Sequence, residues 1–236
     1  MRATTKLVLG VSTLVGAFMY GWSKANSMPI GPQHPGNIGG ELLPEEFGVT
    51  PLVGYRTWHV VNAGDGSGLA LRPLHFGYLW KPGVNDARCD AAGQMFTPAT
   101  HKGDSPDIGC ACGFYAQLPD QPIEEWEFMR LGRVSATGTI EMWGRIIVCS
   151  RGYKAQHVSI QGPVVLEVSC EMGCDNPATQ VELPHMSVSH YPAYCDEHQP
   201  DHSTPVVTVE AGIWLREACR ELSDRYNIEF LNWSTT

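Results

Sequence analysis

Charge is scarce in this sequence, and positive charge is the scarcer sign. Charged residues make up 17% of the 236 residues, and 16 Lys and Arg stand against 25 Asp and Glu, for a formal net charge of −9. A general nucleic-acid-binding protein needs a cationic surface to displace counterions, so this deficit argues against nucleic acid as a partner. The apolar share of 43% in turn excludes a wholly disordered chain.

The common catalytic signatures are also missing. The sequence has no HExxH, no GxSxG, no phosphate-binding P-loop and no DNA-reading helix motif. Glu124, Glu125 and Glu127 form an acidic cluster, but adjacent acids point in different directions in a helix or a strand. Such a cluster is typical of a solvated face. We therefore predict no catalytic residue and favour a non-catalytic protein.

Long apolar runs are limited to one stretch near the N-terminus. The run from Leu7 to Trp22 has 16 residues without a charge, whereas a spanning helix usually needs about 20 apolar residues. It follows a basic start and fits the apolar region of a signal peptide. We predict that residues 1–27 form a signal- or anchor-like segment that contacts a membrane through residues 7–22. A helix that packs on the folded domain is the alternative.

The location of the protein depends on this segment. Residues 1–28 hold three basic residues and no acid, which leaves 13 basic and 25 acidic residues in the rest of the chain. The positive-inside rule then favours a cytoplasmic N-terminus and an exported body. Translation from Met28 would remove the apolar segment and leave a cytoplasmic protein.

The rest of the chain is predicted to be α+β and mostly β. Gly (25) and Pro (17) favour many turns and short strands. Residues 28–53 are interpreted as a Pro/Gly linker with one helical turn over Glu41–Phe47, and residues 54–169 as a β-rich domain, a small antiparallel sheet or a partly open barrel. Residues 170–236 are interpreted as a zinc-ribbon-like module with a C-terminal helix. The strands are expected over 55–61, 69–74, 76–80, 133–143, 145–149, 155–160 and 164–168.

The C-terminal helix has the clearest periodicity. Apolar residues recur at helical spacing from Ala211 through Trp214 and Leu222 to Tyr226, and charged residues fill the positions between them. This pattern predicts an amphipathic helix over Val209–Tyr226 whose apolar face docks on the domain core. Cys219 falls on that apolar side and is expected to be a core residue.

Four residues near the C-terminus have the layout of a tetrahedral zinc site. Cys170 and Cys174 form one close pair, and Cys195 and His198 form a second pair 20 residues beyond Cys174. Each short spacing places two ligands about one metal ion, and the intervening loop closes the tetrahedron. The alternatives are a disulfide within residues 170–195, or a different imidazole in place of His198. The histidines that could substitute are His185, His190 and His202.

A second set of metal ligands is predicted upstream. Cys110 and Cys112 are separated by one residue, which strains a disulfide between them but lets both thiolates reach one metal ion. With Cys89 and His101 they make another set of three sulfurs and one nitrogen. Cys149 is a fifth candidate, and a Cys89–Cys149 disulfide or buried thiols are the alternatives.

Several motifs between residues 54 and 160 resemble an uncharacterised family of actinobacteria and their phages. They are the GYRTW start at Gly54, the WKPG run that begins at Trp80, the CACGFYA core that begins at Cys110, and the RGYKA run that begins at Arg151. The resemblance implies kinship of fold and no assigned activity. His often stands in this family at the position of Cys149, which implies a metal-ligand or near-ligand role there. The apolar start departs from the family.

These observations predict a non-catalytic, zinc-stabilised binding or adaptor protein, phage-encoded by the resemblance, that acts through a protein partner. Two alternatives stay open. One is an exported envelope protein stapled by disulfides, and the other is a metal-dependent hydrolase that uses the Cys89–Cys112 set with a metal-bound water.

Overall fold

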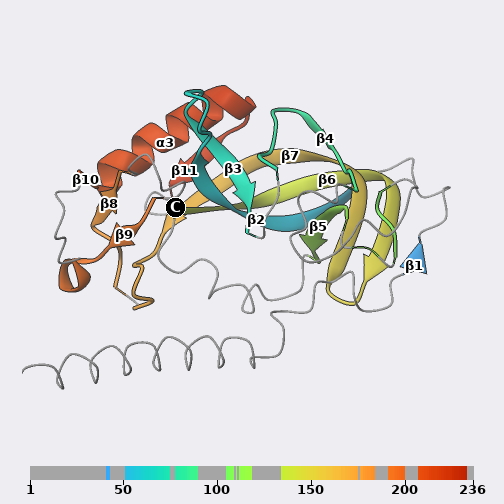
Figure 1. Cartoon of the computed structure of the whole chain (residues 1–236), viewed down its shortest axis with the longest axis horizontal. Coiled ribbons are helices and arrows are strands. Elements are labelled where there is room, and N and C mark those ends of the chain that lie inside the picture. Colours follow the sequence, from blue (N-terminus) through green and yellow to red (C-terminus); the bar gives the residue numbers. More distant parts are fainter. Residues whose placement is uncertain are drawn as a thin grey trace, which may run out of the picture. The chain divides into compact units, whose positions relative to one another are not determined.

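The computed structural model (Figure 1) describes a β-rich protein with one long helix among the described residues. The described residues are 41–42, 51–74, 78–89, 105–108, 110, 112–118, 134–174, 176–183, 191–199 and 207–232.

Two long antiparallel strands form the spine of the main sheet. β6 (Val134–Cys149) and β7 (Gly152–Val168) run side by side, with Ala136 opposite Leu166 and Ile140 opposite Ile160. Alternate side chains of both strands are buried, which gives the sheet one core-facing side. The pairing slips between Trp143 and Ile146, and this irregularity includes the positive-φ residue Gly144.

Shorter strands complete this sheet, and four of the paired strands form a closed circuit. β2 (Leu52–Asn62) pairs with β6, and β5 (Phe114–Gln117) pairs with both β2 and β7. The circuit β6–β2–β5–β7–β6 is therefore continuous, although Tyr55 and Gln117 are the single β2–β5 pair. The remaining strands are β1 (Glu41–Leu42) on β6, β3 (Leu69–Pro73) on β2, β4 (Val84–Asp86) on β7, and β11 (Phe230–Asn232) parallel to β7.

The helix α3 (Ala211–Tyr226) closes the core over this sheet (Figure 1). Its buried residues include Trp214, Leu222 and Tyr226, as the helical spacing predicts. The Tyr226 hydroxyl accepts a hydrogen bond from the Leu71 amide and donates one to the Trp80 carbonyl, both at 3.0 Å. The phenol thereby satisfies two buried backbone groups.

A small second sheet lies between β7 and α3 in the sequence. It has the order β10–β8–β9, with β8 (Gln180–Glu182), β9 (Ala193–Tyr194) and β10 (Thr208–Glu210), and all pairs are antiparallel. Because β10 leads directly into α3, the small sheet is connected to the helix that covers the main core.

The predicted class is confirmed, since the fold is α+β and mostly β, with a C-terminal helix. The main sheet is mixed rather than antiparallel, because β11 joins it in parallel. Strands predicted over 155–160 and 164–168 form one strand, β7. The helix begins at Ala211 because residues 208–210 pair with β8 instead.

Two local predictions are wrong. Glu41 and Leu42, the first residues of the predicted helical turn, lie in a strand, because they pair with Val148 and Ile147 of β6. Residues 43–47 of that turn lie outside the described residues. Tyr78–Trp80 is not a strand, and Trp80 instead donates its amide to the Leu71 carbonyl at 2.9 Å. The first residues of that predicted strand, and the apolar run 7–22, lie outside the described residues. In the described ranges, no helix has both the length and the apolar character needed to cross a membrane.

Candidate metal centres

The first pair of C-terminal ligands lies at the end of β7. Ser169 forms an isolated bridge with Pro177, and Cys170 follows it directly. The chain then turns, with the Gly173 amide donating to the Cys170 carbonyl at 2.9 Å. Gly173 has φ of +67°, a conformation that favours glycine, and this turn brings Cys174 back toward Cys170.

The second pair is brought to the same place by β9. The Glu171 amide donates to the Ala193 carbonyl at 2.8 Å, which fixes the first turn against β9. Cys195 follows β9 and begins the short 3-10 helix η5 (Asp196–His198). The His198 amide donates to the Cys195 carbonyl at 3.1 Å, so His198 folds back beside Cys195.

These four side chains form the C-terminal metal centre, defined here as Cys170, Cys174, Cys195 and His198. Their ligand atoms all lie within 4.8 Å of one another. The Cys174 and Cys195 sulfurs are 3.6 Å apart, and His198 Nδ1 is 3.2 Å from the Cys195 sulfur and 3.8 Å from the Cys170 sulfur. Tetrahedral zinc with ordinary bond lengths requires about 3.8 Å between two sulfurs and about 3.6 Å between sulfur and nitrogen. The predicted ligands are therefore together, at distances that could hold a metal ion.

The cysteines are not joined by disulfides. All eight are free thiols, and a sulfur separation of 3.6 Å is far longer than the about 2.0 Å of a disulfide bond. The disulfide alternatives for residues 170–195 and for Cys89–Cys149 are thus not formed. His185, His190 and His202, the alternative imidazoles, lie outside the described residues.

The thiols of the C-terminal centre are not equivalent. Burial alone would raise the pKa of Cys170, but hydrogen bonds from the backbone of Cys195 and Met172 outweigh it and hold that pKa below its ordinary value. Desolvation and the neighbouring thiols raise the pKa of Cys174 to about 11. A metal ion must therefore displace a tightly held proton at Cys174, whereas Cys170 gives up its proton more readily than an ordinary thiol.

Three of the predicted upstream ligands also come together, as the second metal centre, defined here as Cys89, Cys110 and Cys112. Cys89 follows β4, and the other two cysteines precede β5. The three sulfurs lie within 4.8 Å of one another, and Cys89 and Cys110 are 3.6 Å apart. This group, too, could hold a metal ion. His101, the predicted fourth ligand, lies outside the described residues.

Cys149 is near this centre but is not a member of it. It ends β6, and its thiol donates a long hydrogen bond of 3.9 Å to the Ile147 carbonyl. Burial raises the pKa of Cys149, and the nearby Lys154 partly opposes that rise. Cys149 therefore lies beside Lys154 as a buried thiol, and the group of three close sulfurs does not include it.

Lys154 is the residue at this centre that sequence reasoning missed. It lies on β7 and is fully buried, and its ammonium donates to the carbonyls of Asp107 at 2.6 Å and Cys110 at 2.7 Å. Burial lowers its pKa, while the three nearby cysteines, Cys110, Cys112 and Cys149, act to raise it. Alternation along β7 gives no signal for it, because Lys154 and Ala155 are both buried and Ala155 is the one that packs in the apolar core with Val158 and Ile160.

Comparison of the chain with protein-family models, curated proteins and solved structures gives no match. The two centres therefore have to be interpreted from their own chemistry.

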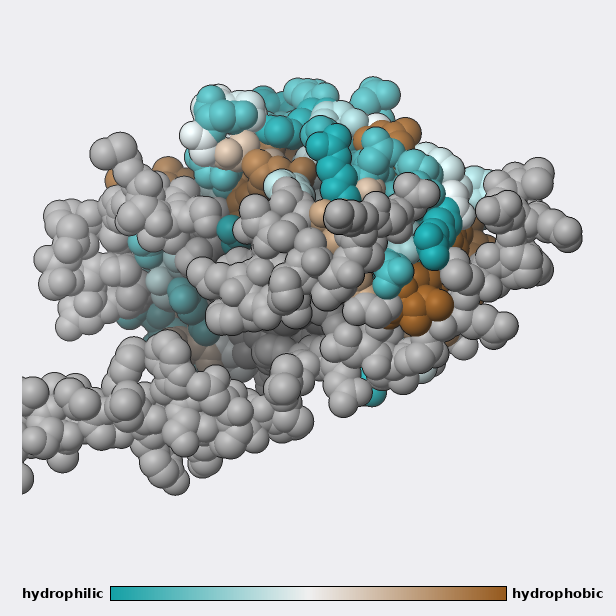
Figure 2. All heavy atoms as spheres, turned by 45° about the vertical axis from the view of Figure 1, so that its right-hand side comes forward, coloured by the Kyte–Doolittle hydropathy of each residue, from teal (hydrophilic) through white to brown (hydrophobic). Residues whose placement is uncertain are grey.

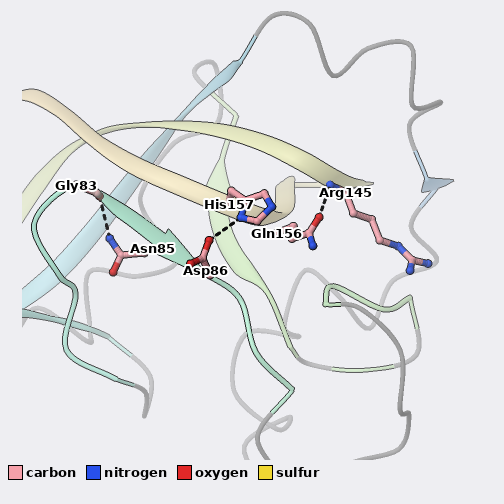
Figure 3. Close-up of polar contacts among 6 residues, drawn as sticks. All are labelled: Gly83, Asn85, Asp86, Arg145, Gln156 and His157. Atoms are coloured by element: carbon pink, nitrogen blue, oxygen red, sulfur yellow. Dashed lines mark hydrogen bonds and ion pairs between the residues drawn. The ribbon is translucent and has the colours of Figure 1, made fainter.

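A polar cluster on β4 and β7 is also absent from the sequence predictions (Figure 3). Asp86 Oδ1 lies 2.7 Å from His157 Nδ1, and the His157 ring stacks on Trp143 with centroids 6.0 Å apart. A carboxylate that orients an imidazole is half of a nucleophile-activating arrangement. Within the described part of the chain, His157 has no hydrogen bond to a hydroxyl or thiol, so we assign the pair to the attachment of β4 to β7.

Proposed function

We propose that this protein is a zinc-stabilised, non-catalytic binding or adaptor protein. The observation that supports the proposal is the C-terminal metal centre, in which the ligand atoms of three thiols and one imidazole lie within 4.8 Å of one another. The proposal also assigns zinc to the second metal centre, with His101 as its proposed fourth ligand. The phage origin rests on the motif resemblance alone.

The donor set favours zinc. Thiolate sulfur with imidazole nitrogen in a tetrahedral arrangement is typical of zinc sites, whereas magnesium and calcium take oxygen ligands. The half-buried positions of Cys174 and His198, against buried Cys170 and Cys195, leave a path for the ion to enter.

A structural role follows from the number of protein ligands. Four protein ligands fill a tetrahedral ion and leave no position for substrate or activated water. What the ion can supply is stability: structural zinc contributes about 10–16 kcal/mol of apparent binding free energy in small modules. Here the ion would join the end of β7 to the end of β9 and so hold a small sheet with short strands in place.

A protein is the proposed partner. The formal net charge of −9 disfavours nucleic acid, and Cys170–His198 contains no Lys or Arg. Several apolar side chains are exposed, among them Tyr78, Val84 and Met172. Figure 2 shows hydrophilic and apolar residues interspersed over the described part of one face. A non-obligate protein interface is about as apolar as the rest of a protein surface, so this face is suitable for one.

Metal content with thiol titration tests the proposal. We expect purified full-length protein to contain two zinc ions per chain. Chelation should expose the six ligand thiols, whereas Cys149 and Cys219 lie outside both centres and should react independently of metal. If the protein contains one zinc ion per chain and loses it in Cys195→Ser, the result would support zinc binding at the C-terminal centre alone. A metal-free chain that gains no stability from added zinc would overturn the proposal.

A further inference from the structure

The second metal centre has an unusual neighbour in Lys154, a lysine with 0% of its surface exposed. Lysine is almost never fully buried without a partner, because an ammonium loses its hydration. The two carbonyls that it contacts, those of Asp107 and Cys110, are dipoles and cannot neutralise a full charge. The Asp107 side chain also acts on Lys154, and because Asp107 is only partly buried, solvent weakens this effect.

The packing shows that the cysteine segment is shaped around this lysine. Gly113 follows Cys112 with φ of +112°, and a Cβ there would lie 2.6 Å from Lys154 Cγ and 2.8 Å from Pro106 Cβ. The absence of a side chain at Gly113 therefore lets the lysine stem pass beneath the chain. Its ammonium then reaches the backbone of a ligand residue, Cys110.

The charge that matches Lys154 is the one that a metal complex would create. Three thiolates around one divalent ion leave one excess negative charge when the fourth ligand is neutral. In a buried site that excess is costly unless a cation compensates it.

We propose that Lys154 is the charge partner and positioning residue of the second metal centre. Its ammonium neutralises the tri-thiolate complex, and its hydrogen bonds hold Cys110 in place for the ion. This inference rests on the proposed zinc occupancy of Cys89, Cys110 and Cys112. It concerns that centre alone, because the segment Cys170–His198 contains no Lys or Arg.

The test is chelator competition on the zinc-loaded full chain, which compares Lys154→Met with wild type. We expect one of the two zinc ions to bind about 10–100-fold more weakly, the usual effect of losing a group that supports the ligands, and the other to be unchanged. Lys154→Arg, which keeps the charge, should recover part of the loss. Lys81→Met, at an exposed lysine, is the matched control and should have no effect.

The outcomes separate the inference from the proposed function. Two zinc ions with unaltered affinities in Lys154→Met, or equal weakening of both ions, would overturn the role of Lys154 and leave zinc binding intact. A wild-type chain with no metal at Cys89, Cys110 and Cys112 would overturn both.

A second variant covers the case in which Lys154→Met does not fold. Lys154→Met is then introduced into a chain in which Cys89, Cys110 and Cys112 are replaced by serine. This chain is compared with the same triple-serine chain that keeps Lys154. In that background, which lacks the second metal ion, the substitution should not lower the midpoint of thermal unfolding, because no thiolate charge is left there to compensate. An unchanged destabilisation there would show a purely structural lysine and refute the inference.

Discussion

Replacing Cys195 by serine should remove the C-terminal metal ion. Cys195 is the central ligand of this centre, since its sulfur lies 3.6 Å from that of Cys174 and 3.2 Å from His198 Nδ1. If four ligands share an apparent zinc binding free energy of about 10–16 kcal/mol, one ligand accounts for about 2.5–4 kcal/mol. Because each 1.4 kcal/mol is tenfold, zinc affinity should fall by about 10²–10³-fold.

The assay is zinc competition with a chelator of known affinity, followed by thermal unfolding with and without metal. Cys219→Ser is the matched control, because Cys219 is a half-buried thiol on α3 outside both metal centres. We expect this control to bind zinc as wild type does. The added stability that zinc gives wild type should be largely absent in Cys195→Ser, since a ligand stabilises the state that it binds.

The result that would refute the reasoning is a Cys195→Ser chain with wild-type zinc content and affinity. Equal losses in Cys195→Ser and Cys219→Ser would also contradict it, because they would indicate a general effect of losing a thiol.

Three further predictions concern pH, packing and the N-terminus. Because the pKa of Cys89 is raised to about 12 and that of Cys174 to about 11, zinc must displace protons, and its affinity should fall as pH falls. The same raised values mean that the metal-free fold binds these protons more tightly than the unfolded chain, so its free energy of unfolding should decrease as pH rises from about 9 toward 11, measured by urea denaturation. Leu222→Ala, at a fully buried position of α3, should cost about 2–5 kcal/mol in the same assay, and a cost below 1 kcal/mol would contradict the assigned core. A reporter enzyme active only outside the cytoplasm, fused after residue 50, should be active if residues 7–22 direct export, and inactivity would favour the cytoplasmic alternative.

Local patterns predicted much of the fold. The β2–β3 hairpin, the interruption of β6 at Gly144 and the apolar face of α3 all follow from alternation, turn residues and helical spacing. These signals are local, since each depends on residues within a few positions of one another. The α3 start at Ala211 was missed because Thr208–Glu210 is held in a strand by β8, a partner far away in the sequence.

The candidate metal residues were predictable for a similar reason. Cys170, Cys174, Cys195 and His198 are two close pairs, and metal chemistry requires such pairs at short spacing. Cys149 could not be placed by spacing, because its distance from the other thiols depends on how β6 lies against β7 and β5. The structure leaves it outside the group of three close sulfurs.

By itself, the sequence determined a mostly β chain with a terminal amphipathic helix and two sets of thiols with ligand spacing. Only the tertiary structure decided that β11 pairs in parallel with β7 and that Lys154 lies buried beneath the second metal centre. The physical reason is that periodicity and ligand spacing are properties of neighbouring residues. Burial of a charge, in contrast, depends on which distant segments close over it, here the segment of Pro106 and Cys110 folded onto β7.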